Sequence, residues 1–262
     1  MELAKVRDLF DRQLRRDARP DEPGARVERV GGVVRRVGPE KGWSGVLWSD
    51  LDADTADAAI AEQVRFFGGL GRAFEWKTYG HDLPVDLPER LAAAGFEAEE
   101  PETLLVAETA ALPHDTPPPA GVRLLPVTEE AHVELAERVH ERAFGPGRAA
   151  VGHQLRAQLA QDPDTVPAVV ALHGEEPVSA ARLELHPGTA FASLWGGGTV
   201  PEWRGRGVYR SLVAFRVRIA AERGFSYVQV DASPYSRPIL ERLGFTALGT
   251  TTPYVWEPPA GR

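Results

Sequence analysis

The sequence predicts an α/β protein with two domains, each built from a mixed, largely antiparallel sheet flanked by helices. Three observations support this prediction. A glycine-rich turn joins a strand to a helix between Ser193 and Arg210. A series of strand, helix, strand, helix and two further strands occurs in both halves of the chain. A segment with four prolines, 113–121, separates the halves. We therefore expect domains at 1–112 and 122–262, joined by a linker at 113–121.

The composition is that of a globular protein without nucleic-acid partners. Of its 262 residues, 43% are hydrophobic, which is enough for the cores of two domains. The net charge of −8 argues against a general basic face for phosphate backbones. The absence of cysteine excludes disulfides, thiolate metal sites and a cysteine nucleophile. No apolar run approaches the roughly 20 residues of a membrane helix, and the charged first residues are typical of a helix rather than a signal peptide. We therefore expect a cytoplasmic protein without membrane contacts.

Hydrophobic periodicity predicts the elements of both halves. The first half is expected to contain helices at 2–18, 55–67 and 87–94, with strands at 26–37, 43–48, 73–78, near Phe96 and at 104–107. The second half is expected to contain helices at 128–144 and through 151–159, with strands at 122–126, 166–172, 178–186 and 189–199. Three glycines, 196–198, interrupt the last of these strands. They indicate either a β-bulge or a place where a ligand lies against the sheet.

The turn before Arg210 has the layout of an anion site. The apolar spacing after the turn predicts a helix that begins near Gly207, and the first N–H groups of a helix have no intrahelical acceptor. Gly205 and Gly207 let the backbone approach a ligand closely. Arg204, Arg206 and Arg210 add positive charge. Together these features favour a phosphate ligand.

The same residues resemble the cofactor motif of the GNAT superfamily of acetyltransferases, V-x-P-x-x-[QR]-x-x-G-x-[GA], which aligns with Thr199 to Tyr209. Thr199 stands at the valine position, and Tyr209 stands where the family keeps glycine or alanine. A second family motif, N-x-x-A-x-x-L-Y-x-x-x-G-F, resembles residues 233–245. The resemblance implies a GNAT fold for the second domain, acetyl-CoA as cosubstrate and no metal. The residues that it assigns to acetyl-CoA are Gly198, Thr199, Val200, Arg204, Gly205, Arg206, Gly207, Val208, Tyr209, Arg210, Ser233 and Ser236.

The first domain resembles the second without the glycine loop. Residues 87–96 and 237–245 both read as a short helix that ends in Gly-Phe, which indicates a duplicated domain. Segment 49–55, which stands in place of the loop, contains three aspartates and no glycine. Because these carboxylates would repel a pyrophosphate, we expect a GNAT-like domain without a cofactor site. We interpret the neighbouring pair His81 and Asp82 as a cap or a domain-interface hydrogen bond rather than a catalytic dyad.

Acetylation of an amine requires the loss of a proton from the amine and a proton for the departing thiolate. GNAT enzymes often use a glutamate on the strand before the loop as base and a tyrosine in the second motif as acid. Ser193 and Leu240 stand at these positions. The resemblance therefore leaves both proton carriers open.

Strand pairing offers Glu184 as a substitute base. A two-residue hairpin at Pro187 and Gly188 would place Ser193 opposite Arg182 and Glu184 diagonal to Ser193, within reach through one water. The alternative is an exposed ion pair between Arg182 and Glu184. Tyr235 and Tyr254 are the candidate acids, and each has the alternative of a packing role. Trp195, His153 and Arg156 are candidate walls of an acceptor pocket or ordinary packing and surface residues.

These inferences give a leading hypothesis and two alternatives. The first is an acetyl-CoA-dependent N-acetyltransferase that acts on a primary amine of a small molecule by direct attack on the thioester. The second is an acyl-CoA-binding module that senses or regulates without turnover. The third keeps the enzyme but makes a protein N-terminus or lysine the acceptor. We expect a monomer that acts as a pseudo-dimer, because the duplicated domain can supply the contacts of a second subunit.

Overall fold

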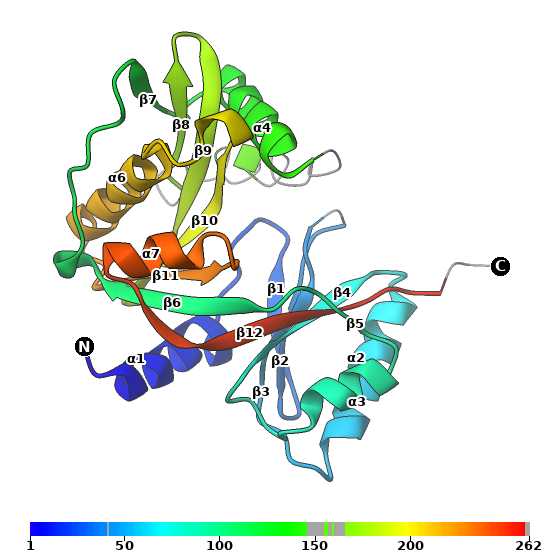
Figure 1. The fold of residues 1–262 in the computed structure, drawn as a ribbon. Helices are drawn as coiled ribbons and strands as arrows, with labels where there is room; N and C mark the ends of the chain where they lie inside the picture. Colours follow the sequence, from blue (N-terminus) through cyan, green and yellow to red (C-terminus); the bar gives the residue numbers. More distant parts are fainter. Residues whose placement is uncertain (41, 146–154, 157–158, 160–165, 260–262) are drawn as a thin grey trace. The chain divides into compact units, whose positions relative to one another are not determined.

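The computed structural model describes the chain except residues 41, 146–154, 157–158, 160–165 and 260–262 (Figure 1). The chain forms two compact units. The first unit contains residues 1–104, 231–235 and 247–262, and the second contains 105–230 and 236–246. No helix in the described ranges is long and apolar enough to cross a membrane.

The first unit is a mixed sheet with helices. Its strands lie in the order β1–β2–β3–β4–β12, with β5 beside β12, and the β3–β4 pair is parallel. The strands are β1 (Arg26–Val30), β2 (Val33–Val37), β3 (Gly45–Ser49), β4 (Phe74–Tyr79), β5 (Glu97–Ala98) and β12 (Thr246–Trp256). The helices are α1 (Leu3–Phe10), a π-helical continuation at Asp11–Arg16, α2 (Ala56–Gly69) and α3 (Leu87–Ala93). The single extended run expected at 26–37 is a hairpin, β1 and β2, that turns at Gly31 with φ +56°.

Aromatic side chains fill the core of the first unit. Phe67 of α2 stacks on Phe74 of β4 at 4.3 Å between ring centroids, and Phe96 packs edge-on against Phe74. Trp76 and Phe67 are almost fully buried. Burial of such large rings stabilises the packing of α2 and α3 on the sheet.

The second unit carries the glycine-rich loop. Its strands lie in the order β6–β11–β10–β9–β8–β7. They are β6 (Glu102–Glu108), β7 (Val122–Pro126), β8 (Ala168–His173), β9 (Glu176–Leu185), β10 (Phe191–Thr199) and β11 (Tyr227–Ala232). The β7–β8, β8–β9 and β9–β10 pairs are antiparallel, and β10–β11 is parallel. The main helices are α4 (Glu130–Phe144), α6 (Val208–Glu222) and α7 (Arg237–Leu243). This mixed, largely antiparallel arrangement confirms the predicted fold class.

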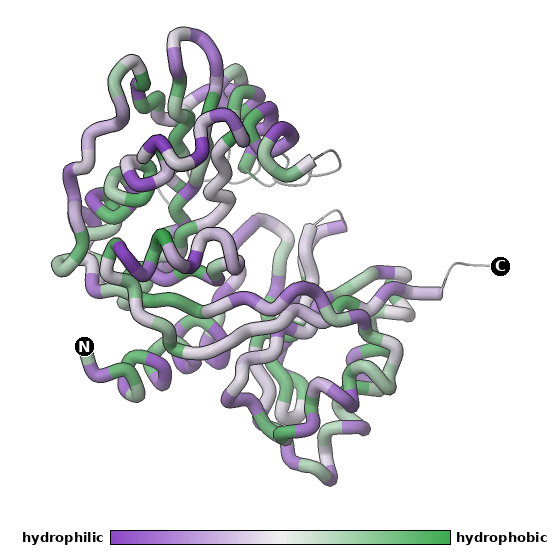
Figure 2. Tube along the Cα trace, viewed as in Figure 1, coloured by the Kyte–Doolittle hydropathy of each residue, from purple (hydrophilic) through white to green (hydrophobic). Residues whose placement is uncertain are grey.

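Helices cover both faces of the sheet in the second unit. Val169, Val170 and Ala171 are consecutive in β8 and all fully buried, although successive strand residues point to opposite faces. Figure 1 shows α4 and α6 on either side of these strands, and both contact β9 and β10. Apolar and polar residues alternate along α4 (Figure 2), whose buried residues include Val133 and Val139. The amphipathic pattern of the sequence therefore positions the helix.

The compact units divide the chain differently from the expected domains 1–112 and 122–262. Strand β12, at the end of the sequence, pairs with β4 from Thr251↔Tyr79 to Trp256↔Phe74 and belongs to the first unit. Residues 105–108 of β6 belong to the second unit, as does the proline-rich segment 113–121. Each half of the sequence thus supplies a strand to the other half's sheet. A boundary drawn from proline content cannot detect this exchange, because strand pairing depends on distant residues.

Candidate functional site

The loop after β10 presents a group of unpaired backbone amides. Gly205 has φ +72° and Gly207, the residue before α6, has φ +91°. Glycine adopts such left-handed angles readily, whereas a side chain would strain them. Within the described chain no acceptor bonds the N–H groups of Gly205, Arg206, Gly207 and Val208. These amides lie at the positive end of a 15-residue helix, where anions are stabilised.

Three arginines surround these amides in two different roles. Arg204 holds the loop in place, because its guanidinium donates to the carbonyls of Thr199 (3.1 Å) and Ala143 (3.0 Å). Arg206 lies over the Trp203 ring, 4.9 Å from its centroid. In the described part of the chain neither Arg206 nor Arg210 has a carboxylate partner. Their uncompensated charges make the loop a binding surface for an anion.

The other residues assigned to acetyl-CoA have varied surroundings. The Ser179 hydroxyl bonds the Gly198 carbonyl and the Thr199 hydroxyl, at 2.6 and 2.8 Å, and so holds the end of β10. Val200 and Val208 are buried in the core. Ser236 precedes α7, and Ser233 follows β11 among the residues of the first unit.

Tyr209 turns inward rather than toward the loop surface. Burial raises the pKa of its hydroxyl, and the nearby Arg216 guanidinium only partly opposes this rise. The residue as a whole is half-buried, so the hydroxyl rather than the entire side chain is withdrawn from the loop surface.

A β-bulge interrupts β10 at its glycines. The register with β9 shifts by one residue between Trp195↔Arg182 and Gly198↔Ala180, which confirms the predicted bulge. Three aromatic rings of the protein occupy the space that side chains would need at the glycines 196–198. A Cβ at Gly196 would lie 3.2 Å from His140, one at Gly197 would lie 2.9 Å from Tyr209, and one at Gly198 would lie 2.7 Å from Phe144. Glycine is thus required here by the protein's own packing.

Beyond Ser193 one edge of β10 is open. The parallel ladder with β11 runs from Phe191↔Tyr227 to Ser193↔Gln229, whereas the ladder with β9 continues to Thr199. Among the described residues, the bulge therefore has a strand partner on the β9 side alone. Peptide groups at such an edge can bond a bound molecule.

A buried polar network lies where the β10–β11 ladder ends. Ser193 is only 1% exposed, and its hydroxyl oxygen lies 2.5 Å from Gln229 Nε2 and 2.7 Å from His186 Nε2. The amide of Gln229 donates to the oxygen, and the Ser193 hydroxyl donates its proton to His186 Nε2 when that nitrogen is the acceptor. In this arrangement the neutral imidazole of His186 carries its own proton on Nδ1. Ser193 and His186 thus form a connected pair that can move a proton.

The predicted register of this hairpin is wrong. Ser193 pairs with Glu184, not with Arg182. The connection is longer than two residues, because Thr189 bonds the His186 carbonyl with both its amide (3.1 Å) and its hydroxyl (2.9 Å). Glu184 forms an ion pair with Arg182 at 3.0 Å, as the alternative interpretation held, but the pair is largely buried rather than exposed.

The candidate acids do not share a unit with Glu184. Tyr235 is 85% exposed and, like Tyr254, belongs to the first unit. Tyr254 pairs with Trp76 in the ladder and packs against the core of the first unit. Burial raises its pKa, with a smaller contribution from Glu89. These surroundings are those of a packing residue.

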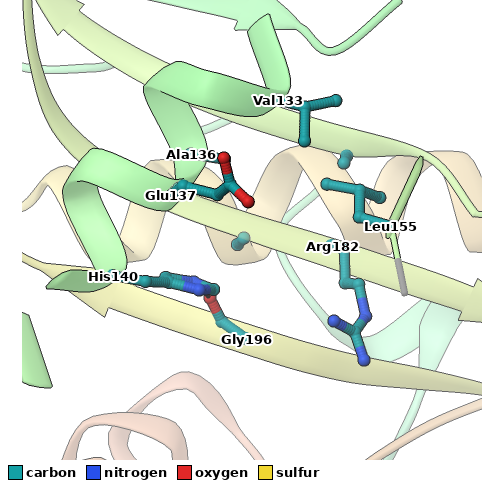
Figure 3. Close-up of a pocket in the computed structure, with 10 residues that line it drawn as sticks. Val133, Ala136, Glu137, His140, Leu155, Arg182 and Gly196 are labelled. Carbon is teal, nitrogen blue, oxygen red and sulfur yellow. Dashed lines mark hydrogen bonds between the residues drawn. The ribbon is translucent and has the colours of Figure 1, made fainter. Parts of the chain in front are cut away.

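A small pocket, with a free volume of about 20 Å³, lies between α4 and the sheet of the second unit. His140 and Gly196 lie together at one end, and Leu155 and Arg182 lie toward the other (Figure 3). The remaining lining residues are Val133, Ala136, Glu137, Ala168, Ala180 and Ala181.

The three residues expected to form walls of the acceptor pocket have different positions. Arg156 does not line the pocket and instead pairs with Glu137 at 2.6 Å. Trp195 is 41% exposed, with the Arg182 guanidinium 5.9 Å from its ring centroid. His153 lies outside the described residues.

His140 is a site residue that the sequence analysis missed. Its Nε2 donates to the Gly196 carbonyl at 2.6 Å, and the residue is 7% exposed. The only available signal was a histidine and an aromatic residue one helical turn apart, His140 and Phe144, together with a glycine run that needs bulky partners.

In segment 49–55 of the first unit, a carboxylate already occupies two of the backbone amides. The Asp52 carboxylate accepts the N–H groups of Asp54 (3.1 Å) and Thr55 (2.9 Å). His81 bonds Asp11, and Asp82 bonds Arg15 and the Tyr79 amide, so the His81–Asp82 pair serves structural hydrogen bonds. No cluster of three or more metal-ligating side chains occurs in the ranges that the structure describes.

Comparisons with known proteins agree with this geometry. Residues 132–245 match the family model described as Acetyltransferase (GNAT) family. No curated protein sequence matches the chain. A GCN5-related N-acetyltransferase from Kribbella flavida has a similar structure (TM-score 0.72, 19% identity, 99% of this chain and 96% of that chain). A conserved protein of unknown function from Staphylococcus epidermidis is also similar (TM-score 0.68, 13% identity, 90% and 95%). So is a tandem GNAT protein from the clavulanic acid biosynthesis pathway (TM-score 0.60, 14% identity, 92% and 86%). The chain therefore has a GNAT fold, and residues 132–245 form its match to the GNAT acetyltransferase family.

Proposed function

We propose that the chain is an acetyl-CoA-dependent N-acetyltransferase that acts on a primary amine of a small molecule. The observation that carries this proposal is the row of unpaired amides from Gly205 to Val208 beside Arg206 and Arg210. A pyrophosphate needs such a combination of amides and uncompensated cations. In segment 49–55 of the first unit the Asp52 carboxylate accepts the N–H groups of Asp54 and Thr55 and would repel an anion, so we place binding in the second unit.

Different features of the second unit serve phosphate binding and polarisation of the acetyl carbonyl. Acetyl-CoA supplies the activated acetyl group as a thioester. The loop amides and Arg206 hold its phosphates, and the open edge of β10 offers peptide groups along the bulge. An N–H group at the bulge polarises the acetyl carbonyl, which is the stabilisation that acyl transfer needs most.

We infer that the proton of the amine leaves through Ser193 and His186. As the amine nitrogen bonds the acetyl carbon and the carbon–sulfur bond breaks, the Ser193 oxygen accepts the proton of the amine, directly or through water, and its own proton passes to His186 Nε2. The thiolate of CoA leaves and takes its proton from solvent. Gln229 orients that oxygen. This pair replaces Glu184 as our first choice of base, because Glu184 is engaged with Arg182.

The pocket argues for a small acceptor. Its free volume is about 20 Å³, room for about one water molecule, and its walls combine alanines and valine with the polar groups of Glu137, His140 and Arg182. A space of this size excludes a folded protein surface and admits only a small group such as an amine. The acceptor itself is therefore sought among low-molecular-weight amines.

The direct test measures thiol release from acetyl-CoA over a panel of small amines. We expect turnover by the parent chain, and a fall in kcat of about 10²- to 10⁴-fold in Ser193→Ala and His186→Gln near neutral pH. The loss should be smaller at alkaline pH, where the amine is deprotonated unaided. Glu184→Gln should have a weaker effect, and Glu241→Gln, on the exposed face of α7, is the matched control. Equal pH profiles for Ser193→Ala and the parent would remove Ser193 and His186 from proton transfer.

A non-catalytic acyl-CoA-binding module is the second candidate. It is favoured by Leu240, which is fully buried where the family often has a tyrosine, and by the high exposure of Tyr235. Tight binding of acetyl-CoA without thiol release on any amine would establish it in place of the enzyme.

A further inference from the structure

We propose that His140 is a positioning residue that fixes the direction of the bulge peptide between Gly196 and Gly197. This inference rests on the proposed acetyl transfer, and it names a residue that acts through the backbone rather than on the substrate. The hydrogen bond from His140 Nε2 to the Gly196 carbonyl, at 2.6 Å, is its starting point.

The geometry of the peptide group makes this bond decisive. In a planar trans peptide the C=O of one residue and the N–H of the next point in opposite directions. Because His140 holds the Gly196 carbonyl toward α4, the N–H of Gly197 must point away from α4. Gly196 has φ +57° and Gly197 has no side chain, so the local sequence leaves this peptide free to rotate. A side chain outside the strand must therefore fix the direction of this peptide group.

The packing around the bulge supports the same role. His140 belongs to the inner face of α4, is 7% exposed and packs edge-on against Phe144, with 5.8 Å between ring centroids. Beside Gly197 of the same strand lies the ring of Tyr209 from α6, whose hydroxyl is buried. The imidazole therefore has little room to swing away, and its donor stays on the Gly196 carbonyl. A carbonyl fixed in this way keeps the next amide preorganised for a developing negative charge.

His140 also lines the pocket, which links the bulge to the proposed acceptor site (Figure 3). An acceptor in the pocket would lie against the ring that orients the peptide. The inference thus joins two features of the second unit, the pocket and the open edge of β10, through one side chain.

The first experiment compares His140→Gln, whose amide can still donate to the Gly196 carbonyl, with His140→Leu, which fills similar space without a donor. We expect His140→Leu to lower kcat by about 10- to 100-fold, below the roughly 10²- to 10³-fold cost of deleting an oxyanion donor. KM for acetyl-CoA and for the amine should change less than about threefold, since phosphate and acceptor contacts remain. His140→Gln should recover most of the rate. Equal losses in both variants, or a loss confined to KM, would overturn the positioning role.

The second experiment reads the peptide without activity. The chain has four Gly–Gly peptide bonds, 31–32, 68–69, 196–197 and 197–198. Labelling glycine with ¹³C at the carbonyl and ¹⁵N at the amide restricts an HNCO spectrum to these bonds. We expect the Gly196 carbonyl and Gly197 amide signals to shift in His140→Leu and to stay near their parent positions in His140→Gln. The 31–32 and 68–69 signals, from the first unit, are internal controls.

The controls keep the two proposals separable. His132→Leu, on the same helix but bonded to the Thr128 amide, should change neither the bulge signals nor kcat. If His140→Leu does not fold, His140→Asn, whose amide is too short to reach the carbonyl, takes its place. Unchanged Gly196 and Gly197 signals in His140→Leu, or in His140→Asn where it is used instead, would overturn the inference. If the variants show the expected signal shifts but the parent chain acetylates no amine, the proposed function is overturned instead.

Discussion

Gly207 and Gly224 stand at opposite ends of α6 with similar left-handed backbone angles, φ +91° and φ +81°. They differ in surroundings, because a Cβ on Gly207 would lie 3.2 Å from the Arg210 guanidinium and one on Gly224 would meet nothing within 4 Å. We expect Gly207→Val to weaken acetyl-CoA binding by at least about 100-fold, or about 2.7 kcal/mol. Gly224→Val should cost comparable folding stability, about 1–2 kcal/mol, and leave binding intact. Calorimetric dissociation constants of the two variants decide this, and equal constants would show that the loop is misassigned.

Asp11 provides a pH-dependent contribution to stability. Burial raises the pKa of its carboxyl, but hydrogen bonds from His81 and Arg15, both 2.7 Å, outweigh burial and leave the pKa below its ordinary value. A carboxyl with a lower pKa in the folded chain adds stability above its unfolded pKa, and this stability is lost as the pH falls through its folded pKa. We expect Asp11→Asn to lower the free energy of unfolding at pH 7 by about 2 kcal/mol. The difference should shrink below about pH 4.

Urea denaturation at pH 7 and pH 3 measures this difference. Asp8→Asn, an exposed position on α1, is the control and should unfold like the parent at both values. An equal loss of unfolding free energy in Asp11→Asn at both pH values would contradict the pH-dependent role of Asp11.

At the residue scale, the sequence predicts best where the backbone itself encodes the feature. Gly205 and Gly207 predict a tight turn, because glycine adopts positive φ angles that would strain the backbone of other residues. His140 could not be found in this way, since its partner is a carbonyl 56 positions away and any donor of the right length would serve. Ser193 was singled out for its place in the motif, but its bonds to His186 and Gln229 depend on a register that the turn length decides.

The glycines of the β10 bulge pack against side chains from both α4 and α6. A Cβ on Gly197 would lie 2.9 Å from the Tyr209 ring, whose buried hydroxyl limits how far the ring can move. We expect Gly197→Ala to destabilise the chain by about 1–3 kcal/mol through overpacking. In a Tyr209→Ala background the same substitution should cost almost nothing, because the clashing ring is gone.

A double-mutant cycle by urea denaturation tests this coupling. Gly69→Ala in α2, where a Cβ meets nothing within 4 Å, should be neutral or slightly stabilising. Additive costs for Gly197→Ala and Tyr209→Ala would mean that the ring does not hold the bulge.

At the element scale, the sequence predicted the type of most elements and the position of the bulge, but not the hairpin register. The turn at 186–189 closes through the Thr189 hydroxyl and amide, and a short Pro-Gly pair does not reveal that extra length. A shift of two positions keeps the same face but changes which side chains meet. This is why Glu184, rather than Arg182, lies opposite Ser193.

The exchange of strands between the two halves of the sequence governs how the whole molecule folds. Fragment 1–112 lacks β12 and would expose the edge of β4, while fragment 122–262 lacks the buried Leu105, Val106 and Ala107 of β6. We expect neither fragment alone to unfold cooperatively, because each misses a strand of its sheet. Co-expressed fragments should restore a folded, associated pair. Circular dichroism melts and co-purification measure both outcomes, and a fragment that melts cooperatively by itself would contradict the exchange.

Calorimetric titration of the intact chain with acetyl-CoA tests the central claim most directly. The amides of Gly205 to Val208 are unpaired, whereas in segment 49–55 of the first unit the Asp52 carboxylate accepts the N–H groups of Asp54 and Thr55. One binding site per chain is therefore the predicted result, and Gly207→Val should abolish it. Two sites per chain, or one site that survives Gly207→Val, would contradict the assignment of the loop.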